Sequence, residues 1–393
     1  MSLKIGIAGA GIGGLAAGAL LAGQGHEVTV YDQFDAPRPV GSGLVIQPVG
    51  LEVLDAIGAG DMVRSKGNHI TRMLGHESEA KRRVLDVWYD RAGDGVTYGL
   101  GIHRAALFDA VLNAALEAGV TLTSSHEATA FEHGHIHFKS HPTSPKFDLI
   151  IDASGASSDL SAIKATPLPY GAIWGTVPWP ETDLPLDHLS QSYRRADRMM
   201  GVLPCGTLPG SDIQQAAIFW SMPRDAHPNW LVTPLDDWKR EATTLWPAFA
   251  PFLETIKTHD QMTMARYSHG TLRKPYGDRL AIIGDSAHKA SPQLGQGANM
   301  ALLDAMALAQ ALKYEDNINV ALHHYASARR WHVRIYQAMS WAFTPQYQSD
   351  STWLPKLRDH ALFPLSQIAP TPRILTRLVC GNLIPPLGSL TPR

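Results

Sequence analysis

A glycine-rich turn near the start of the chain constrains the fold more than any other feature. The turn, Gly9-Ala10-Gly11-Ile12-Gly13-Gly14, joins a short apolar run at residues 4–8 to an alanine- and leucine-rich segment at residues 12–23. Residues 27–31 then alternate between apolar and polar, as in a strand. A strand, a helix and a second strand in this order predict a right-handed βαβ unit of an α/β fold. The turn then lies at the carboxyl end of the first strand, where open parallel sheets bind ligands.

Three glycines of this turn have separate physical roles. Gly9 permits the tight turn, Gly11 lets the backbone approach a pyrophosphate group, and Gly14 lets the helix pack closely against the strand. The helix N-terminus supplies free N–H groups and a partial positive charge. Asp32 follows the second strand and is placed to accept hydrogen bonds from ribose hydroxyl groups. We therefore predict a Rossmann-like, dinucleotide-binding domain.

A second glycine-containing segment lies late in the chain and also follows an apolar strand, at residues 280–283. It begins with Gly284-Asp285 and runs through Pro292 to Gly295-Gln296-Gly297. The chain here resembles the group A flavoprotein monooxygenases, the para-hydroxybenzoate hydroxylase-like family, whose members carry a G-D-A-A-H-x-x-x-P-x-x-G-Q-G motif. Ser286 replaces the first alanine of that motif. The resemblance implies FAD-dependent hydroxylation of an aromatic or related electron-rich small molecule.

The resemblance also implies roles for individual residues. In this family the aspartate matching Asp285 holds the ribityl hydroxyl groups of FAD, and the turn matching residues 294–299 runs along the pyrimidine edge of the flavin ring. The carbonyl group of the proline matching Pro292 faces the substrate, and we expect Gln47 to line the same cavity. The expected catalytic residues are Pro292 and Gln47, and the expected cofactor-binding residues are Gly9, Gly11, Gly14, Asp32, Gly43, Arg104, Gly284, Asp285, Gly295, Gly297, Ala298 and Asn299.

The implied reaction starts with reduction of the flavin by NADH or NADPH. O2 is then captured as a flavin hydroperoxide, and its distal oxygen is transferred to the substrate. This chemistry needs an enclosed cavity rather than a nucleophilic side chain. A structural role is expected for His288. Spacing identifies no catalytic base, and the candidate histidines are His103, His188, His227 and His269.

One segment departs from the family pattern. Members carry A-D-G after the strand matching residues 149–151, with arginines nearby, and its aspartate is associated with FAD and nicotinamide handling. Here the segment reads Ala153-Ser154-Gly155, with no arginine nearby. Three alternatives therefore stay open: a flavoprotein reductase or dehydrogenase acting on a C–C double bond, a monooxygenase fed by a separate flavin reductase, and a non-catalytic flavin-binding module.

The chain of 393 residues is long enough for two domains and a tail. Residues 167–269 are rich in proline, tryptophan and short alternating runs, which predicts a mostly antiparallel sheet. Trp174, Tyr193, Trp220 and Trp230 are equally compatible with a pocket wall and with a core. We predict a discontinuous FAD-binding domain (1–75, 100–166 and 270–320), an inserted substrate-binding domain (76–99 and 167–269) and a C-terminal helical segment (321–393).

Composition narrows the range of partners. A net charge of −2 leaves no basic excess for a phosphate backbone, so we expect no nucleic-acid partner. Cys205 and Cys380 are too few for a disulfide scaffold and lack metal-ligand spacing, so we expect no metal site and a cytoplasmic location. No apolar run reaches the roughly 20 residues that span a bilayer.

The remaining expectations concern assembly and the tail. We expect a monomer or homodimer that binds an aromatic small molecule and O2. The proline-punctuated tail, residues 347–390, is expected to pack against the body of the protein. A dimer surface and peripheral membrane contact are the alternatives for this tail.

Overall fold

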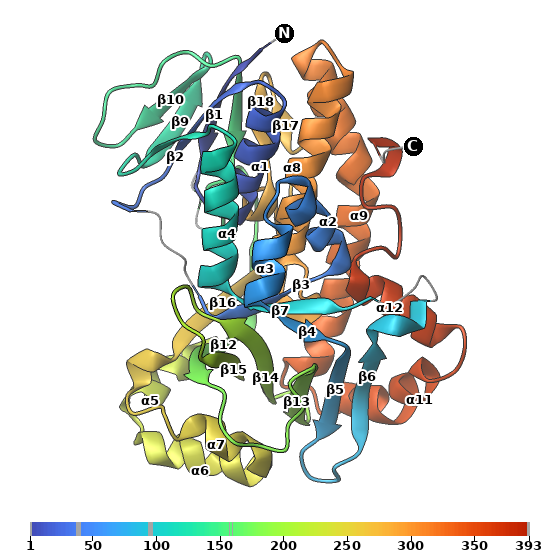
Figure 1. The fold of residues 1–393 in the computed structure, drawn as a ribbon. Coiled ribbons are helices and arrows are strands. Elements are labelled where there is room, and N and C mark those ends of the chain that lie inside the picture. Colours follow the sequence, from blue (N-terminus) through green and yellow to red (C-terminus); the bar gives the residue numbers. More distant parts are fainter. Residues whose placement is uncertain (1, 37–40, 93–96, 157, 159, 391–393) are drawn as a thin grey trace.

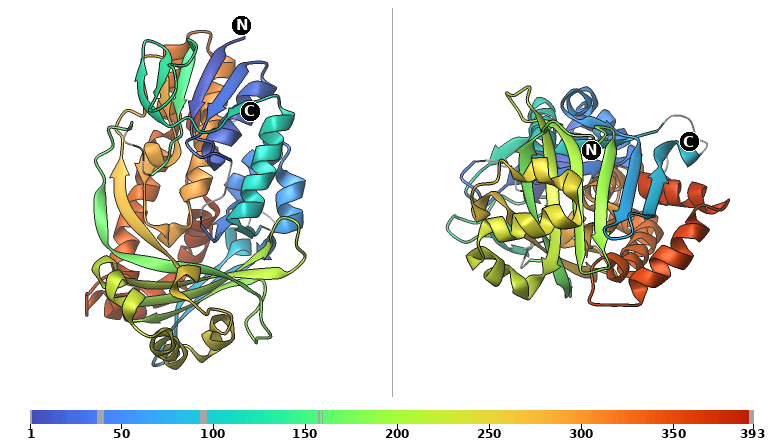
Figure 2. Two further views of the ribbon diagram at one scale, coloured as in Figure 1. Left: turned by 90° about the vertical axis from the view of Figure 1, so that its left-hand side faces the viewer. Right: turned by 90° about the horizontal axis from the view of Figure 1, so that it is seen from below.

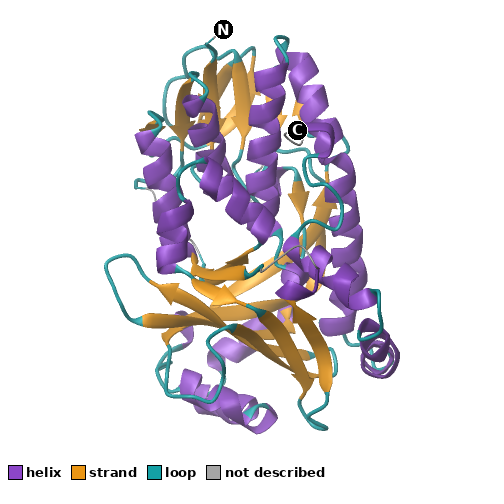
Figure 3. Ribbon diagram, turned by 45° about the vertical axis from the view of Figure 1, so that its right-hand side comes forward, coloured by secondary structure: helices purple, strands orange, loops and turns teal. Residues whose placement is uncertain are grey.

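Two large sheets dominate the fold. A six-stranded sheet lies in the upper half of the molecule and an eight-stranded sheet in the lower half, with helices running between them (Figure 1, Figure 3). In the part of the chain that is described, no helix is both long and apolar enough to cross a membrane. The computed structural model describes residues 2–36, 41–92, 97–156, 158 and 160–390, so that Ser157 and Asp159 lie outside the described residues.

The six-stranded sheet is mostly parallel. β1 (Lys4–Ala8) pairs in parallel with β2 (Glu27–Tyr31) on one side and with β11 (Leu149–Asp152) on the other. Apolar residues of these strands are buried on both faces, as is usual for parallel sheets. The parallel strands end at one common edge. The complete order is β17 (Tyr276–Gly277), β18 (Leu280–Ile282), β11, β1, β2 and β8 (Thr121–Thr123), in which β17 runs antiparallel to β18.

Helices cover one face of this sheet and a hairpin covers the other. α1 (Ile12–Gly23) follows the first glycine turn and packs against α4 (Arg104–Glu117) and α8 (Gly297–Tyr314). Alanine, valine and leucine side chains make most of these contacts, and their small size lets the helices lie close together. Further elements of this half are α2 (Pro48–Ala56), α3 (Gly60–Lys66) and the hairpin of β9 (Ala128–Glu132) and β10 (His135–Phe138).

The eight-stranded sheet is almost wholly antiparallel and has two different faces. One face carries Trp220 and is covered by three helices, seen at the bottom of the left view in Figure 2: α5 (His227–Val232), α6 (Leu235–Leu245) and α7 (Ala250–Leu253). The other face carries Leu203 and Ala217, which pack against Val45 and Tyr89. The strand order is β19 (His288–Lys289), β16 (Thr263–Thr271), β12 (Thr166–Pro178), β15 (Gln214–Pro223), β14 (Arg198–Thr207), β13 (His188–Arg194), β5 (Arg72–Glu77) and β6 (Arg83–Trp88), with β13 and β5 parallel.

A small antiparallel sheet lies between the two halves. Its order is β3 (Gly43–Ile46), β7 (Gly99–His103) and β4 (Asn68–Ile70). β3 and β7 also contact β14 of the large sheet. The ends of β3 and β7 lead directly to Gln47 and Arg104, so this sheet sets where these two residues stand.

The C-terminal segment is helical and wraps one side of the molecule (Figure 1). α9 (Ile318–Tyr347) is its long element, and it begins where the Asn317 side chain accepts the N–H groups of Asn319 and Val320 as an N-cap. The shorter helices that follow are α10 (Leu354–Leu357), α11 (Phe363–Ser366) and α12 (Thr371–Cys380).

Candidate cofactor and active site

The first glycine turn directly follows β1. Gly9 adopts a left-handed backbone conformation with φ of 108°, and its N–H group donates to the Tyr31 carbonyl oxygen over 2.7 Å. A methyl group added at Gly14 would clash with the Gly9 carbonyl oxygen, so only glycine allows the helix to approach here. Gly11 differs, because a side chain there would meet no protein atom within 4 Å. The space beside Gly11 is open and belongs to a cleft.

This cleft has a volume of about 390 Å³ and lies where the parallel strands end. No side chain caps the N-terminus of α1, so its first N–H groups remain available to a ligand. Gly14, Gly43, Gly295 and Asn299 are placed elsewhere, in the packing around the cleft. The predicted cofactor residues that line it are Gly9, Gly11, Asp32, Arg104, Gly284, Asp285, Gly297 and Ala298.

Charged side chains of both signs line the cleft. The Asp32 carboxylate accepts the N–H groups of Ala10 over 2.7 Å and of Phe34 over 3.0 Å, which fixes it beside the first turn. Arg104 and Asp285 lie about 180 residues apart in the sequence and interact electrostatically. Burial lowers the pKa of the Arg104 guanidinium, and the negative charge of Asp285 opposes that shift.

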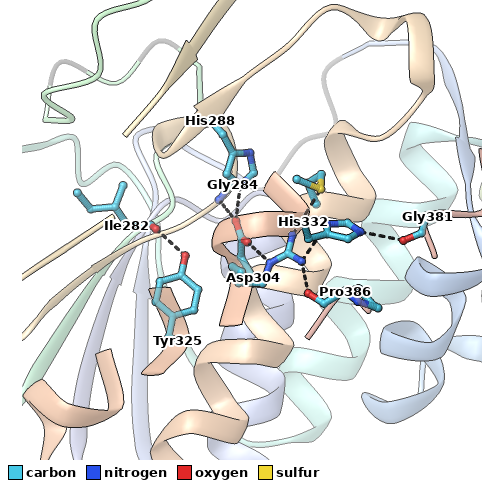
Figure 4. Close-up of polar contacts among 10 residues, drawn as sticks. Ile282, Gly284, His288, Asp304, Tyr325, His332, Gly381 and Pro386 are labelled. Carbon is cyan, nitrogen blue, oxygen red and sulfur yellow. Dashed lines mark hydrogen bonds and ion pairs between the residues drawn. The ribbon is translucent and has the colours of Figure 1, made fainter. Parts of the chain in front are cut away.

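The second glycine segment is held by a buried carboxylate, Asp304 of α8 (Figure 4). Its Oδ2 accepts the Gly284 N–H over 2.9 Å and the His288 Nε2–H over 2.6 Å. Its Oδ1 accepts the Arg329 Nε–H over 2.7 Å. Burial alone would raise the pKa of Asp304, but the charges of His288 and Arg329 outweigh it and lower the pKa to about 2. This ionised carboxylate therefore fixes the turn that carries Asp285.

The same network reaches the C-terminal tail (Figure 4). Arg329 donates to the Pro386 carbonyl oxygen over 2.6 Å and to His332 Nδ1 over 3.2 Å. Since Nδ1 accepts, the neutral ring carries its proton on Nε2, which donates to the Gly381 carbonyl oxygen over 2.8 Å. Burial and the Arg329 charge lower the pKa of His332 to about 3, so it stays neutral near pH 7. A third tail carbonyl, that of Val379, accepts the Gln296 side chain over 2.7 Å.

Asn299 and Gln47 join β3 to the second glycine segment. Asn299 Oδ1 accepts the Gln47 N–H over 2.8 Å, and its Nδ2 donates to the Gly295 carbonyl oxygen over 3.0 Å. Gln47 Oε1 accepts the Tyr89 O–H over 2.8 Å. Both Asn299 and Gln47 are fully buried, so they brace the segment from within the protein.

Pro292 and Gly295 shape the middle of the second segment. Pro292 begins a short 3-10 turn, and its carbonyl oxygen accepts the Gly295 N–H over 2.9 Å. Gly295 has φ of 60°, a left-handed conformation that favours glycine. Gly43 lies apart from this turn and packs against the large sheet. A side chain at this position would collide with Cys205 and Ala217. Close packing therefore explains the glycine at this position.

The two departures from the family motif, Ser154 and Ser286, contact the same buried carboxylate. Asp152 Oδ1 accepts the Ser154 hydroxyl, the Ser154 N–H over 3.0 Å and the Ser286 hydroxyl over 3.3 Å. Ser286 also accepts the Gly155 N–H over 2.9 Å. Burial raises the pKa of Asp152, and these hydrogen bonds lower it. Ser154 and Ser286 are thus parts of one hydrogen-bonded unit at the cleft wall.

Several candidate residues have structural partners. His103 accepts the Ala105 N–H as the N-cap of α4, and His269 accepts the Ser291 N–H over 3.0 Å.

Among the described residues, no group of His, Cys, Asp or Glu side chains could hold a metal ion. The other predicted positions also contact aromatic rings or phenol groups: His188 the Trp88 ring, His227 the Trp230 ring, Trp220 and Trp230 the Trp238 ring, Trp174 the Tyr267 hydroxyl, and Tyr193 the Tyr347 ring.

Sequence reasoning did not identify the supporting charges of the second segment. Arg329 and His332 stand in a helix rich in basic residues, where solvent exposure is the usual expectation. One signal was available, because Asp304 is the single acidic residue in the long apolar run of α8. A lone carboxylate on a buried helix requires a buried partner.

A family model described as an FAD binding domain matches residues 2–162 and 170–336. This match spans most of the chain. The chain belongs to the group A FAD-dependent aromatic hydroxylase family. Family membership confirms the predicted enzyme class, an FAD-dependent monooxygenase, and the predicted cofactor, FAD.

Named members of the family give the range of relatives. The chain is 27% identical over 331 residues to a probable 2-heptyl-3-hydroxy-4(1H)-quinolone synthase of Rhodococcus erythropolis, covering 80% of this chain and 81% of that protein. It is 26% identical over 398 residues to the 6-hydroxynicotinate 3-monooxygenase of Pseudomonas fluorescens, covering 90% of this chain and 92% of that protein.

Solved structures support the fold. A tetrameric form of 2-methyl-3-hydroxypyridine-5-carboxylic acid oxygenase matches with a TM-score of 0.78 at 21% identity, covering 96% of each chain. HpxO of Klebsiella pneumoniae, complexed with FAD and uric acid, matches with a TM-score of 0.80 at 18% identity, covering 97% of this chain and 96% of that one. The predicted α/β class is confirmed at this level.

Proposed function

We propose that this enzyme hydroxylates an aromatic nitrogen heterocycle or a related electron-rich small molecule, with NADH or NADPH as the reductant. The observation that carries the proposal is that residues of both glycine segments line one cleft. FAD, when bound, supplies the electron storage and oxygen activation implied by the family. The protein supplies binding, orientation and exclusion of water.

The open side of the first turn fits a pyrophosphate group. Gly11 leaves space that any side chain would occupy, and the uncapped N-terminus of α1 adds N–H donors and a partial positive charge. Asp32 is fixed beside the turn by two N–H groups. We assign the pyrophosphate to Gly9 and Gly11, and the adenosine ribose to Asp32.

The second segment fits the other half of the dinucleotide. We assign the ribityl hydroxyl groups to Asp285 and further cofactor contacts to Arg104, since both line the cleft. Gly297 and Ala298 lie at the N-terminus of α8, whose partial positive charge would stabilise an anionic flavin ring. The buried carboxylate of Asp304 fixes the position of this segment, because it accepts the Gly284 N–H group.

For the substrate we propose a site between the second segment and the inner face of the eight-stranded sheet. Most strands of this sheet come from residues 167–269, which we predicted to bind the substrate, and its apolar side chains pack against Val45 and Tyr89. Gln47 reaches this region, because the Tyr89 hydroxyl donates to its side chain, and Pro292 lies in the second segment. We propose that Pro292 orients the substrate and that Gln47 supports it indirectly.

The substrate class rests on the names of the relatives. Quinolone and hydroxynicotinate occur in the names of the two relatives given above, and hydroxypyridine carboxylate in that of a structural relative. A further relative, 28% identical over 357 residues, is the kynurenine 3-monooxygenase of Xanthomonas axonopodis pv. citri. All four are aromatic and contain nitrogen. We therefore place quinolones, hydroxypyridine carboxylates and aniline-type acids first among candidate substrates.

A second candidate is a monooxygenase that receives electrons from a separate flavin reductase. Ser154 favours it, because the hydroxyl group is bonded to Asp152 where the family motif has an acid associated with nicotinamide handling. A reductase or dehydrogenase acting on a C–C double bond is the third candidate, and it predicts product formation without consumption of O2.

Anaerobic stopped-flow absorbance of the FAD-loaded protein tests these candidates. The protein is mixed with NADH or NADPH, with and without each candidate heterocycle. We expect flavin bleaching that one aromatic compound accelerates, followed by its hydroxylation when O2 is admitted. Bound FAD that neither nucleotide reduces, but that hydroxylates the substrate after photoreduction, would establish the second candidate instead.

A further inference from the structure

The C-terminal segment exposes several large apolar side chains to solvent. We call six side chains the C-terminal apolar face; each is between 37% and 62% exposed, although large apolar side chains are normally buried. They lie between residue 353, the N-cap of α10, and residue 374 in α12, at the lower right of Figure 1. The six residues are Trp353, Leu357, Leu362, Leu365, Ile368 and Ile374.

The segment that carries this face is packed against and hydrogen-bonded to the body of the enzyme. The other side of α12 is buried through Leu378, Val379 and Cys380, and the Val379 carbonyl is bonded to Gln296 of the flavin motif. Arg358 is buried beneath the segment and donates to the Gln346 carbonyl oxygen over 2.8 Å. The exposed side chains are therefore held outward by a segment that is itself tied to the body of the enzyme.

The C-terminal segment itself contributes exposed positive charge to the face, while the neighbouring 3-10 turn Tyr89–Ala92, which packs against α12, carries the exposed acid Asp90. Lys356 and Arg373 are exposed among its apolar residues. Residues 351–380 contain one carboxylate, Asp359, which is buried and accepts the Arg358 Nε–H over 2.6 Å. Asp350, just before this stretch, accepts the Tyr170 hydroxyl over 2.6 Å. The exposed cations therefore have no acidic counterpart within the face.

We propose that the C-terminal apolar face docks onto the surface of an anionic lipid bilayer. Amphipathic segments with apolar side chains on one face and lysine or arginine beside them lie in the plane of such interfaces. Trp353 suits the boundary between headgroups and acyl chains, where tryptophan is enriched. Lipid phosphates supply the negative charges that pair with Lys356 and Arg373.

A second copy of the chain fits this face poorly. A two-fold dimer places the same patch of both copies in contact. Lys356 and Arg373 would then face their own copies with no exposed carboxylate in the segment to pair with, and like charges at an interface oppose association. The charge distribution thus favours lipid over self-association.

Vesicle co-sedimentation of the full-length, FAD-loaded protein tests the proposal. The vesicles are pure phosphatidylcholine and an equimolar mixture of phosphatidylcholine and phosphatidylglycerol. We expect binding to the mixed vesicles that falls as salt is raised, and little binding to the neutral ones. The double variant Leu365→Ser, Ile368→Ser should weaken binding by about tenfold or more, because two buried aliphatic side chains are lost from the lipid contact.

Two further variants complete the design. Ile213→Ser is the matched control, since Ile213 is as exposed as Ile368 (60% each) but lies in the connection between β14 and β15. It should leave vesicle binding unchanged. Lys356→Gln, Arg373→Gln should remove most of the salt dependence. FAD content of each variant shows that it is folded.

Three outcomes would overturn the proposal. The first is that wild-type protein binds neither kind of vesicle. The second is that Ile213→Ser weakens binding as much as the double serine variant. The third is a dimer, detected by light scattering without lipid, that the double serine variant converts to monomer; this would assign the face to a second copy. None of these outcomes depends on the substrate or on turnover.

Discussion

The two glycine segments that meet at the cleft are stabilised in different ways. The first is completed inside one βαβ unit, where Gly9 bonds to β2 and Asp32 bonds back to the turn. The second is held by Asp304, which in turn depends on Arg329 and on the tail at Pro386. Local backbone geometry shapes the first segment, whereas buried charges from distant parts of the chain shape the second.

This difference separates cofactor contact from cofactor support. At the first segment, the residue that opens the site, Gly11, has no structural partner within reach of a side chain. At the second, Asp285 lines the cleft while its position is set by Asp304, which is 1% exposed. A substitution at Gly11 should therefore affect FAD binding alone, whereas substitutions of the charges behind the second segment should affect folding first.

The largest expected effect comes from breaking the buried ion pair. Arg329→Met removes one of the two charged partners of the buried Asp304 carboxylate and leaves only His288. We expect the free energy of unfolding to fall by about 3–5 kcal/mol, as measured by urea denaturation of the FAD-free protein. FAD retention should fall as well, because Gly284 loses its fixed acceptor.

Arg64→Met is the matched control for this variant. Arg64 and Asp55 also form a short ion pair, at 2.5 Å, but their side chains are 31% and 48% exposed. Solvent screening limits such a pair to about 1 kcal/mol or less. Equal losses in the two variants would show that burial does not distinguish the second segment.

The next-largest effect is a loss of FAD affinity that leaves the stability of the FAD-free protein unchanged. Gly11→Val places a branched side chain in the open space beside the first turn. We expect FAD affinity to drop about hundredfold, equivalent to about 2.7 kcal/mol, measured by flavin fluorescence titration. The thermal unfolding of the FAD-free protein should not change. Gly23→Val, also without a neighbour within 4 Å but at the far end of α1, should leave both quantities unchanged.

The same contrast explains how far the sequence could be interpreted. The α/β class and the residues of the first turn follow from spacing within a short stretch, because glycine requirements there are local. The second segment was recognised by its motif, but its support was not, since Arg329 and His332 look like surface residues of a basic helix. Gln47 was expected to line the substrate cavity and Asn299 to contact the cofactor; both are fully buried and bonded to each other. Burial depends on tertiary packing, and a single sequence does not reveal at which positions a polar side chain is buried.

Acidification should weaken the support of the second segment in a defined range. The pKa of His332 falls from 6.5 to about 3 on folding, because burial disfavours the charged ring. The unfolded chain therefore binds a proton below pH 6.5 that the folded protein does not. Above that pH, His332 does not reduce the free energy of unfolding. As the pH drops from 6.5 toward 3, the free energy of unfolding falls by up to about 1.4 kcal/mol per pH unit. Asp304 adds a further loss only below about pH 4.

Urea denaturation at several pH values between 6.5 and 5 measures this slope. His332→Gln should be less stable at pH 7 and should show a flatter dependence, since the titrating group is gone. His324→Gln is the control, because His324 is 45% exposed and its contact with Glu315 lies at the surface. An unchanged slope in His332→Gln would assign the acid sensitivity to another group.

The smallest effect tests whether the two departures from the family motif act as one unit. Ser154 and Ser286 share Asp152 Oδ1, and Ser286 also holds the Gly155 N–H. Each single change to alanine should cost about 1–3 kcal/mol, because each serine loses a hydrogen bond to a buried carboxylate, and Ser286 also loses its bond to the Gly155 N–H. The double variant should cost less than the sum, with a coupling of about 0.5–1 kcal/mol in a double-mutant cycle.

Additive losses would mean that the two serines stabilise the wall independently. A measurable coupling would mean that replacing the family's acid at position 154 is linked to replacing its alanine at position 286. In that case Ser154→Asp alone would bring a second carboxylate toward buried Asp152 and should destabilise the protein. Nicotinamide reduction kinetics of Ser154→Asp would then be interpretable only together with its stability. The first glycine segment has no comparable pair, because its bonds run from backbone N–H groups to one local carboxylate and one strand carbonyl.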